Sequence, residues 1–338
     1  MSSAGKNSGP DYPTVTVAAG DKGTLSADHV SAQHAPLLHY RPWRGEFGGA
    51  ERSIWPIARI SLRMMFRRKL FWGLYGLGLL IFAMFFFGQY LLAWAETQLA
   101  EQTIKVGPVP FEPARLIMIL RDRLKFNGAG EMYSNFFWYQ GYMVMIVLAM
   151  AGSILIGNDF QFGSLPFYLA KPLGRWHYLL GKCLAISFFV NLMTTVPALV
   201  LYVQFGLLDS WTYFVDHYKL LFGILGYGLL LTVSLSLMVT AVAVWLRRTV
   251  PLVMTWTTVF VFCRLLGNAL VLGFRYDPRW RLIDLWNDSY LVGCFCLGVP
   301  RDVTVQPAVW EAFLVLGALC LLCLIYLNLR IRAVEIVK

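Results

Sequence analysis

Long stretches without a single charged residue dominate this sequence of 338 residues. Four of them run for 26 or 27 residues, at 70–95, 132–158, 183–208 and 220–246. A bilayer core about 30 Å thick is crossed by about 20 helical residues, so each stretch is long enough to span a membrane. With 58% hydrophobic and 14% charged residues, a soluble globular protein is excluded. We therefore predict an all-α polytopic membrane protein.

Two further apolar stretches complete the set of spans. Residues 250–274 contain one charge, Arg264, and residues 312–329 are bordered by the interfacial anchor Trp310. The apolar segment 290–299 is too short to cross, which favours a re-entrant or interfacial position. We predict one membrane domain, 54–338, preceded by a disordered cytosolic tail, 1–53, that lacks hydrophobic periodicity. Its six transmembrane helices are expected at about 70–95, 135–157, 178–208, 220–246, 250–274 and 309–329.

Basic residues are concentrated on one side of the predicted spans. The segments 59–69, 158–182, 247–249 and 330–338 hold 13 Lys or Arg and two acids in 48 residues. The opposite connections hold ten Lys or Arg and twelve acids in 87 residues. The positive-inside rule therefore places both termini in the cytoplasm, in a multi-pass protein of a cell membrane. Because the net charge of +10 is explained by these flanks, no nucleic-acid partner is expected.

The segment before the first span has helical periodicity. Three arginines stand four residues apart, Arg59, Arg63 and Arg67, and apolar residues recur on another face at Trp55, Ala58, Leu62 and Met65. We predict an interfacial amphipathic helix, 54–69, whose basic face meets lipid phosphates or a partner protein. A plain positive-inside anchor would account for the charges alone.

Small residues form stripes on two of the predicted spans. Gly141, Ala149, Ser153 and Gly157 share one face of the second, and Gly228, Thr232, Ser236 and Thr240 share one face of the fourth. Small residues allow helix backbones to approach closely in lipid. We interpret both stripes as packing seams, with a substrate path as the alternative.

The connection between the second and third spans, 158–182, is unusually aromatic for a cytoplasmic loop. Its apolar side chains include Phe162, Phe167, Tyr168 and Leu169. Such a patch would be exposed unless another molecule covers it. A protein partner is the simplest cover.

The same connection contains an ordered motif: an acid, Gly-Ser, a Leu-Ala-Lys-Pro-Leu turn, Arg and then Gly-Lys at the start of a span. This order resembles the first cytoplasmic loop of ABC-2 type permeases, and six spans with cytoplasmic termini also match that family. The matching positions are Asp159, Gly163, Ser164, Pro172, Arg175 and Lys182. Asp159, Ser164 and Ala170 stand where the family more often has Glu, Thr and Ser.

The resemblance implies a transport role. In the family this loop is a coupling helix that docks on an ATPase subunit, so the matching residues together with Phe162 are expected to contact such a subunit. Two ATPase copies, a second permease chain as homodimer or heterodimer, and membrane lipid are the implied partners. The implied membrane is the bacterial cytoplasmic membrane, and the implied direction is export.

The chain lacks a nucleotide-binding loop of its own. A Walker A motif requires Gly-x4-Gly-Lys-Ser/Thr, in which backbone amides cradle the phosphates. The nearest sequence has Gly181 and Lys182, but Trp176 replaces the first Gly and Cys183 replaces the hydroxyl residue. We expect no catalytic residue and no cofactor in this chain, with ATP and Mg²⁺ bound by the partner subunit.

Arg264 is the one charge placed deep within a predicted span. A charge at that depth costs about 2.5–3.5 kcal/mol on insertion scales. Thr257 and Asn268 lie on the same helical face, so the three residues are candidates for a pathway lining that holds an anionic or polar group, or for a pair with an acid. The alternative is a shorter span from which Arg264 snorkels.

Two other function classes remain. An intramembrane enzyme would use the outer His217, Asp209 and Asp216, or Asp277, Asp284 and Asp288, although no His-x-x-Glu-His or Gly-x-Ser-x-Gly spacing occurs and no metal site is expected. A solvated polar loop explains these residues more simply. A non-transporting membrane anchor or signalling partner of an ATPase would also fit the loop motif.

Overall fold

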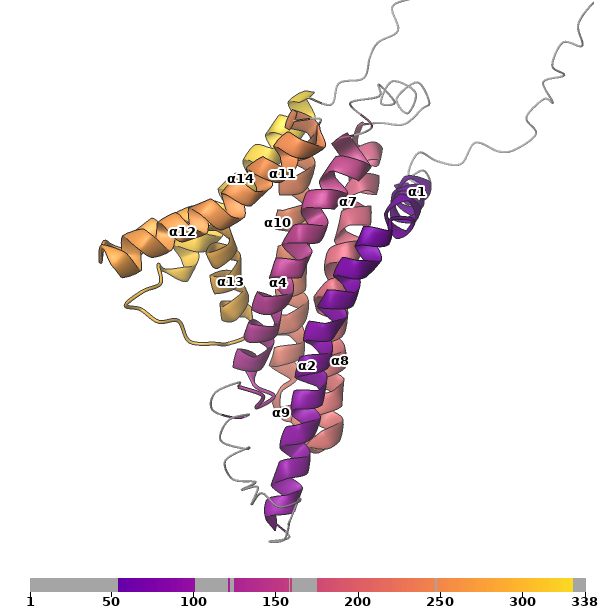
Figure 1. The fold of residues 1–338 in the computed structure, drawn as a ribbon. Helices are drawn as coiled ribbons and strands as arrows, with labels where there is room; N and C mark the ends of the chain where they lie inside the picture. Colours follow the sequence, from indigo (N-terminus) through magenta and orange to yellow (C-terminus); the bar gives the residue numbers. More distant parts are fainter. Residues whose placement is uncertain are drawn as a thin grey trace, which may run out of the picture. The chain divides into compact units, whose positions relative to one another are not determined.

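The computed structural model of this chain describes residues 54–100, 121, 125–157, 159, 175–246 and 248–330, which belong to one compact unit. Every regular element in these residues is a helix (Figure 1). The prediction of an all-α protein is therefore confirmed. The predicted tail, 1–53, lies outside the described residues.

Six helices in the described part of the chain are long and apolar enough to cross a membrane. They agree with the predicted spans to within a few residues because the positions of charged residues limit where a span can begin and end. Length and composition thus fit a multi-pass membrane protein. Their bounds are Lys69–Thr97, Gly130–Gly157, Trp176–Leu208, Tyr218–Leu246, Thr249–Gly273 and Val309–Arg330.

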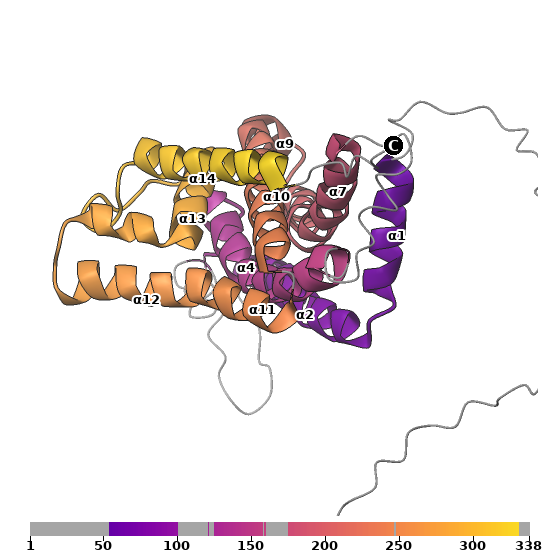
Figure 2. The same ribbon diagram turned by 90° about the horizontal axis from the view of Figure 1, so that it is seen from above.

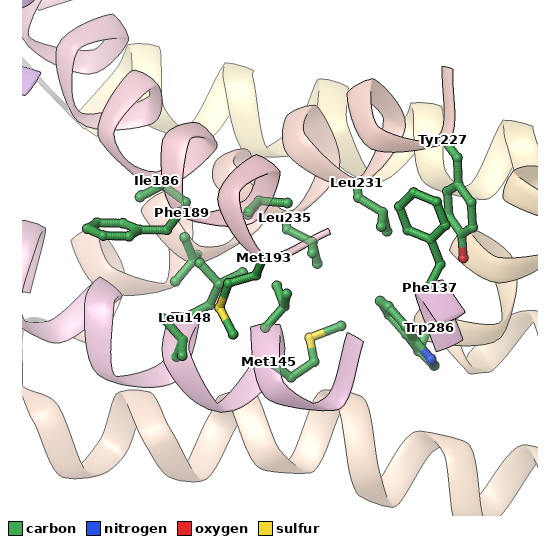
Figure 3. Packing of buried hydrophobic residues seen from close by; sticks show 14 of the residues in the cluster. Phe137, Met145, Leu148, Ile186, Phe189, Met193, Tyr227, Leu231, Leu235 and Trp286 are labelled. Atoms are coloured by element: carbon green, nitrogen blue, oxygen red, sulfur yellow. The ribbon is translucent and has the colours of Figure 1, made fainter. Parts of the chain in front are cut away.

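Three helices form the centre of the bundle: α4 (Gly130–Gly152), α7 (Arg175–Met193) and α10 (Tyr218–Leu246). In α10, 67% of the most apolar window is buried, against 17% in α2 (Lys69–Ala100) and α14 (Val309–Arg330). Figure 3 shows the apolar side chains that fill the space between the central helices, Phe137, Met145 and Leu148 from α4, Ile186, Phe189 and Met193 from α7, and Tyr227, Leu231 and Leu235 from α10. The poorly buried outer helices present their apolar faces outward, as expected of helices in contact with lipid.

Two of the spans are interrupted. The third consists of α7 and α8 (Thr195–Leu208), which are separated at Thr194. Pro197 causes this break because it has no N–H to donate to the Met193 carbonyl. The fifth alternates between α-helix and π-helix through α11 (Thr249–Thr257), η5 (Thr258–Phe262), α12 (Cys263–Asn268) and η6 (Ala269–Gly273). In Figures 1 and 2 this span and α14 lie at an angle to α4 and α10.

The predicted amphipathic helix exists as α1 (Ile54–Phe66), but two details of the prediction are wrong. The helix ends before Arg67, because the chain turns at Arg67 and Arg68 and enters α2 at Lys69. The buried face consists of Ile57, Ala58, Ser61 and Met65, while Trp55 is 61% exposed. This face is rotated from the predicted one because α1 packs against α7. Arg59 and Arg63 remain exposed on α1.

A short helix, α13 (Leu285–Cys296), packs along one half of α4 without crossing the bundle. It begins with Trp286 against Gly141, in the middle of α4, and Leu297, which follows it, lies against Gly130 at the start of α4. The 3-10 helix η7 (Pro278–Ile283) leads into it. The prediction located a short non-spanning segment at 290–299, whereas the helix starts earlier, at the residue that follows the Asp284 cap.

The predicted small-residue seam on the fourth span lies against the third span. Gly228 faces the Thr195 hydroxyl group at the start of α8. Thr232 Oγ1 accepts a hydrogen bond of 2.9 Å from Asn191 Nδ2 of α7. Close backbone approach and interhelical hydrogen bonding therefore both occur along this face.

Gly141 offers a test of the packing of α13. A Cβ atom at this position would collide with the Trp286 indole, so Gly141→Ala should lower stability by about 1–3 kcal/mol, as overpacking does. Gly317→Ala in α14 is the matched control, because nothing lies within 4 Å of its Cβ position. Thermal unfolding of both variants in detergent measures the difference. Equal melting temperatures for the two variants would contradict the packing of Trp286 on Gly141.

Candidate functional site

A buried ion pair joins α7 to the chain that follows α4. The Lys182 ammonium lies 2.8 Å from Asp159 Oδ2. The exposed fractions of Lys182 and Asp159 are 1% and 8%, so the pair is shielded from solvent by protein. In this environment the attraction between the charges is strong, and so is the cost of removing them from water.

Two further hydrogen bonds satisfy the groups of the pair. Lys182 Nζ donates to the Leu155 carbonyl oxygen at 2.6 Å, and Tyr178 Oη donates to Asp159 Oδ2 at 2.9 Å. Leu155 lies in the π-helical segment η4 (Ser153–Gly157) that ends the second span. We call Asp159, Tyr178 and Lys182 the Asp159 latch.

The local sequence explains the geometry of the latch. Tyr178 and Lys182 are four residues apart on α7, so their side chains lie on the same face of the helix. Gly181, beside Lys182, allows α1 to approach, since a Cβ atom there would stand 2.9 Å from Ile57 Cβ. The Gly-Lys dipeptide therefore serves two contacts, one with α1 and one with Asp159.

Asp159 precedes the segment 160–174, and α7, which carries Tyr178 and Lys182, follows it. Among the predicted coupling residues, the structure brings together Asp159 and Lys182. Phe162, Gly163, Ser164 and Pro172 lie outside the described residues, as does the side chain of Arg175, the first residue of α7. Tyr178 was not among the predicted site residues, although its position four residues before Lys182 puts the two side chains on the same helix face.

Arg264 contacts aromatic rings of α4. Its guanidinium carbon lies 4.6 Å from the centre of the Trp138 ring and 5.3 Å from that of Tyr142. Arg264 Nη1 also donates a hydrogen bond to Tyr142 Oη. No carboxylate of the described residues forms an ion pair with Arg264. The structure thus shows a cation–π contact in place of the acid partner considered above.

Arg264 lies in α12, between the π-helical segments η5 and η6 of the fifth span. The fifth span continues past Arg264 to Gly273.

A cavity of about 420 Å³ adjoins the Arg264 side chain. Its lining comes from α4, the fifth span and α13, and consists of Tyr142, Met145, Ile146, Phe260, Val261, Arg264, Leu265, Asn268 and Trp286. Arg264 and Asn268 thus line one cavity, whereas Thr257 lies exposed on α11 and does not contribute. Asn268 Oδ1 accepts a 3.0 Å hydrogen bond from Arg281 Nη2, which brings a second guanidinium to this side of the fold.

Two of the acids considered for an enzyme, Asp277 and Asp284, accept hydrogen bonds from backbone amides. Asp277 Oδ1 accepts a hydrogen bond from the Arg279 amide, and Asp284 Oδ1 accepts from the amides of Trp286 and Asn287. Both acids therefore cap helices, which stabilises the amides of the first turn. His217 stacks on Tyr213, with the ring centres 4.5 Å apart. The described residues contain no group of three or more His, Cys, Asp or Glu that could hold a metal ion.

No protein-family model matches the sequence, and no curated protein matches it either.

The latch makes a specific prediction about stability. Lys182→Met leaves the Asp159 carboxylate buried and unpaired, so we expect a loss of about 3–5 kcal/mol. The double variant Asp159→Asn/Lys182→Met removes both charges and should recover most of that loss. Lys219→Met, at an exposed lysine of α10, is the control for the loss of one charge. Asp159→Asn alone completes the double-mutant cycle, and thermal unfolding in detergent gives the stability of each variant. Additive effects of the two latch substitutions would contradict the pairing.

Proposed function

We propose that this chain is the membrane-spanning permease subunit of an ABC transporter of ABC-2 type, and that it works as an exporter. ATP hydrolysis takes place in a separate ATPase subunit, two copies of which serve two permease chains in a bacterial cytoplasmic membrane. The observation that carries the proposal is the Asp159 latch, which ties together the two spans on either side of the motif that resembles a coupling loop.

Several features support this proposal. The exposed arginines of α1, Arg59 and Arg63, lie on a helix packed against α7, next to the latch. A partner that contacts both α1 and the segment 160–174 would act on α4 and α7 at the same end. In the proposed orientation this end faces the cytoplasm, where the positive-inside rule also puts the arginines.

The proposed mechanism is a rigid-body transition. ATP-driven closure of the two ATPase subunits displaces the segment 160–174, and the buried ion pair transmits the displacement to α4 and α7. Such a transition needs only a difference in contact between the segment and the two states of the ATPase. The cavity beside Arg264 lies between α4 and the fifth span, two elements whose separation would open a path for a polar or anionic group.

Replacement of residues 161–174 by a Gly/Ser linker of equal length tests the coupling role. Because Asp159 and Lys182 remain, we expect the spans to keep their thermal stability while co-purification with the ATPase is lost. The control is the same kind of replacement at 301–304, a turn of exposed residues before α14. If the 161–174 variant co-purifies with as much ATPase as the unaltered chain does, the proposed docking is wrong.

Neutralisation of Arg264 tests the pathway. We expect Arg264→Gln to reduce ATP-dependent transport in vesicles at least tenfold, because the cavity loses its cationic group, while ATPase association is kept. Arg275→Gln, two residues beyond the end of the fifth span, is the control and should transport normally.

Wild-type-like transport by the Arg264 variant would remove this residue from the pathway. If the complex of the unaltered chain with the ATPase hydrolyses ATP but no transport into vesicles is detected, the result would favour a role as a membrane anchor or signalling partner of the ATPase.

A further inference from the structure

Helix α13 carries three consecutive polar residues that are buried. Asn287, Asp288 and Ser289 have exposed fractions of 1%, 0% and 2%. Asn287 exchanges two hydrogen bonds with the side chain of Gln306, at 2.9 and 3.1 Å, and Ser289 Oγ donates to the Leu285 carbonyl. Asp288 between them differs, because neither of its carboxylate oxygens has a hydrogen-bond partner.

Apolar residues lie one turn beyond Asp288 on α13. Leu291 and Val292, three and four residues further along α13, pack with Ala312 and Leu316 of α14. Residues at these spacings share a helix face, so Asp288 lies on the side of α13 that meets α14.

No charge compensates a carboxylate at this position. On α13 and its cap the titratable groups are Asp284, Tyr290, Cys294 and Cys296. The elements packed against α13 also carry titratable groups: Cys263 and Arg264 of α12, Arg279 and Arg281 of η7, Glu311, Cys320, Cys323, Tyr326 and Arg330 of α14, Tyr218, Lys219 and Tyr227 of α10, and Glu131, Tyr133, Tyr139 and Tyr142 of α4. Glu311 pairs with Arg279 at 3.0 Å, and none of the basic groups among these described residues forms an ion pair with Asp288.

A buried carboxylate without a partner takes up a proton, because the desolvation cost of the charge is far larger than that of the neutral acid. Burial, and next the nearby Asp284 carboxylate, raise the pKa of Asp288 to about 8. Burial also raises the pKa of Asp284, but two backbone amides and the guanidinium groups of Arg264 and Arg281 stabilise its ionised form. The two acids of α13 thus differ in what balances their charge.

We propose that Asp288 is a proton-binding site, whose carboxyl group holds a proton while α13 is packed against α14 and releases it when the two helices separate. On release the O–H bond breaks, the proton passes to water, and the electron pair stays on the carboxylate oxygen. The site depends on burial alone and therefore does not rest on the proposed transport function.

The raised pKa of Asp288 makes the packing of α13 against α14 depend on pH. The folded protein has a raised pKa relative to the ordinary value of about 3.9, so the packing of α13 is fully stabilised at low pH. That stabilisation decreases as the pH rises above about 4, and the loss is complete once the pH passes the folded pKa of about 8. Ionised Asp288 favours the separated state.

Infrared spectroscopy of the full chain in phospholipid nanodiscs tests the proposal. We expect a carboxyl C=O band at pH 6 that falls about tenfold by pH 9, as a group with a pKa near 8 requires. The band should be absent in Asp288→Asn and present in Asp302→Asn, the control at an exposed acid. A wild-type spectrum without a carboxyl band that titrates between pH 7 and 9 would overturn the proposal, as would persistence of the band in Asp288→Asn.

A second measurement on the unaltered protein covers the case in which Asp288→Asn does not fold. Dicyclohexylcarbodiimide reacts with protonated carboxyl groups in apolar surroundings, and peptide mass spectrometry locates the product. Modification of Asp288 at pH 6 that declines by pH 9 assigns the titrating band to this residue. A titrating band combined with modification of another acid would assign the proton elsewhere and refute the site. A melting temperature that rises with sodium concentration at pH 7, without a carboxyl band, would identify a bound cation in place of the proton.

Discussion

The buried pair of Asp159 and Lys182 is the interaction on which one end of the bundle depends. The pair holds the end of the second span against the beginning of the third, and Lys182 also donates a hydrogen bond to the Leu155 carbonyl oxygen in η4. α1 packs on the same part of α7 because Gly181 leaves room for Ile57. An apolar contact could hold helices together equally well, but a shift of register that separates a buried ion pair leaves an uncompensated charge, which disfavours other registers.

The spans were predictable from the sequence because excluding charge from about 20 residues is a local requirement. The contacts between spans were less predictable. A pair with an acid was one of the roles predicted for Arg264, whereas in the fold its guanidinium group contacts the rings of Trp138 and Tyr142. Tyr142 is 122 residues away from Arg264 in the sequence. Periodicity indicated that α1 is amphipathic, but α7 decides which face is buried, and the apolar pattern alone cannot locate that neighbour.

In the candidate site, too, some residues were predictable from the sequence and others were not. Asp159 and Lys182 were singled out through their motif, and the fold places them 2.8 Å apart. Tyr178 was missed because an aromatic residue at the start of a span is typical of an interfacial anchor. Thr257 shares a helix face with Arg264 in an ideal helix, but the π-helical segment η5 lies between them and changes the angular relation. The period of 3.6 residues per turn therefore does not predict shared helix faces across a π-helical segment.

Two buried aspartates show how one fold treats the same side chain in opposite ways. Asp159 has a lysine and a tyrosine hydroxyl within hydrogen-bonding distance, so its ionised form is compensated. Asp288 has neither, and its burial against α14 favours the neutral acid. The first arrangement ties two helices together at any pH at which both groups are charged. The second leaves a buried carboxyl group without a compensating charge, which is the basis for proposing that the contact between α13 and α14 depends on a proton.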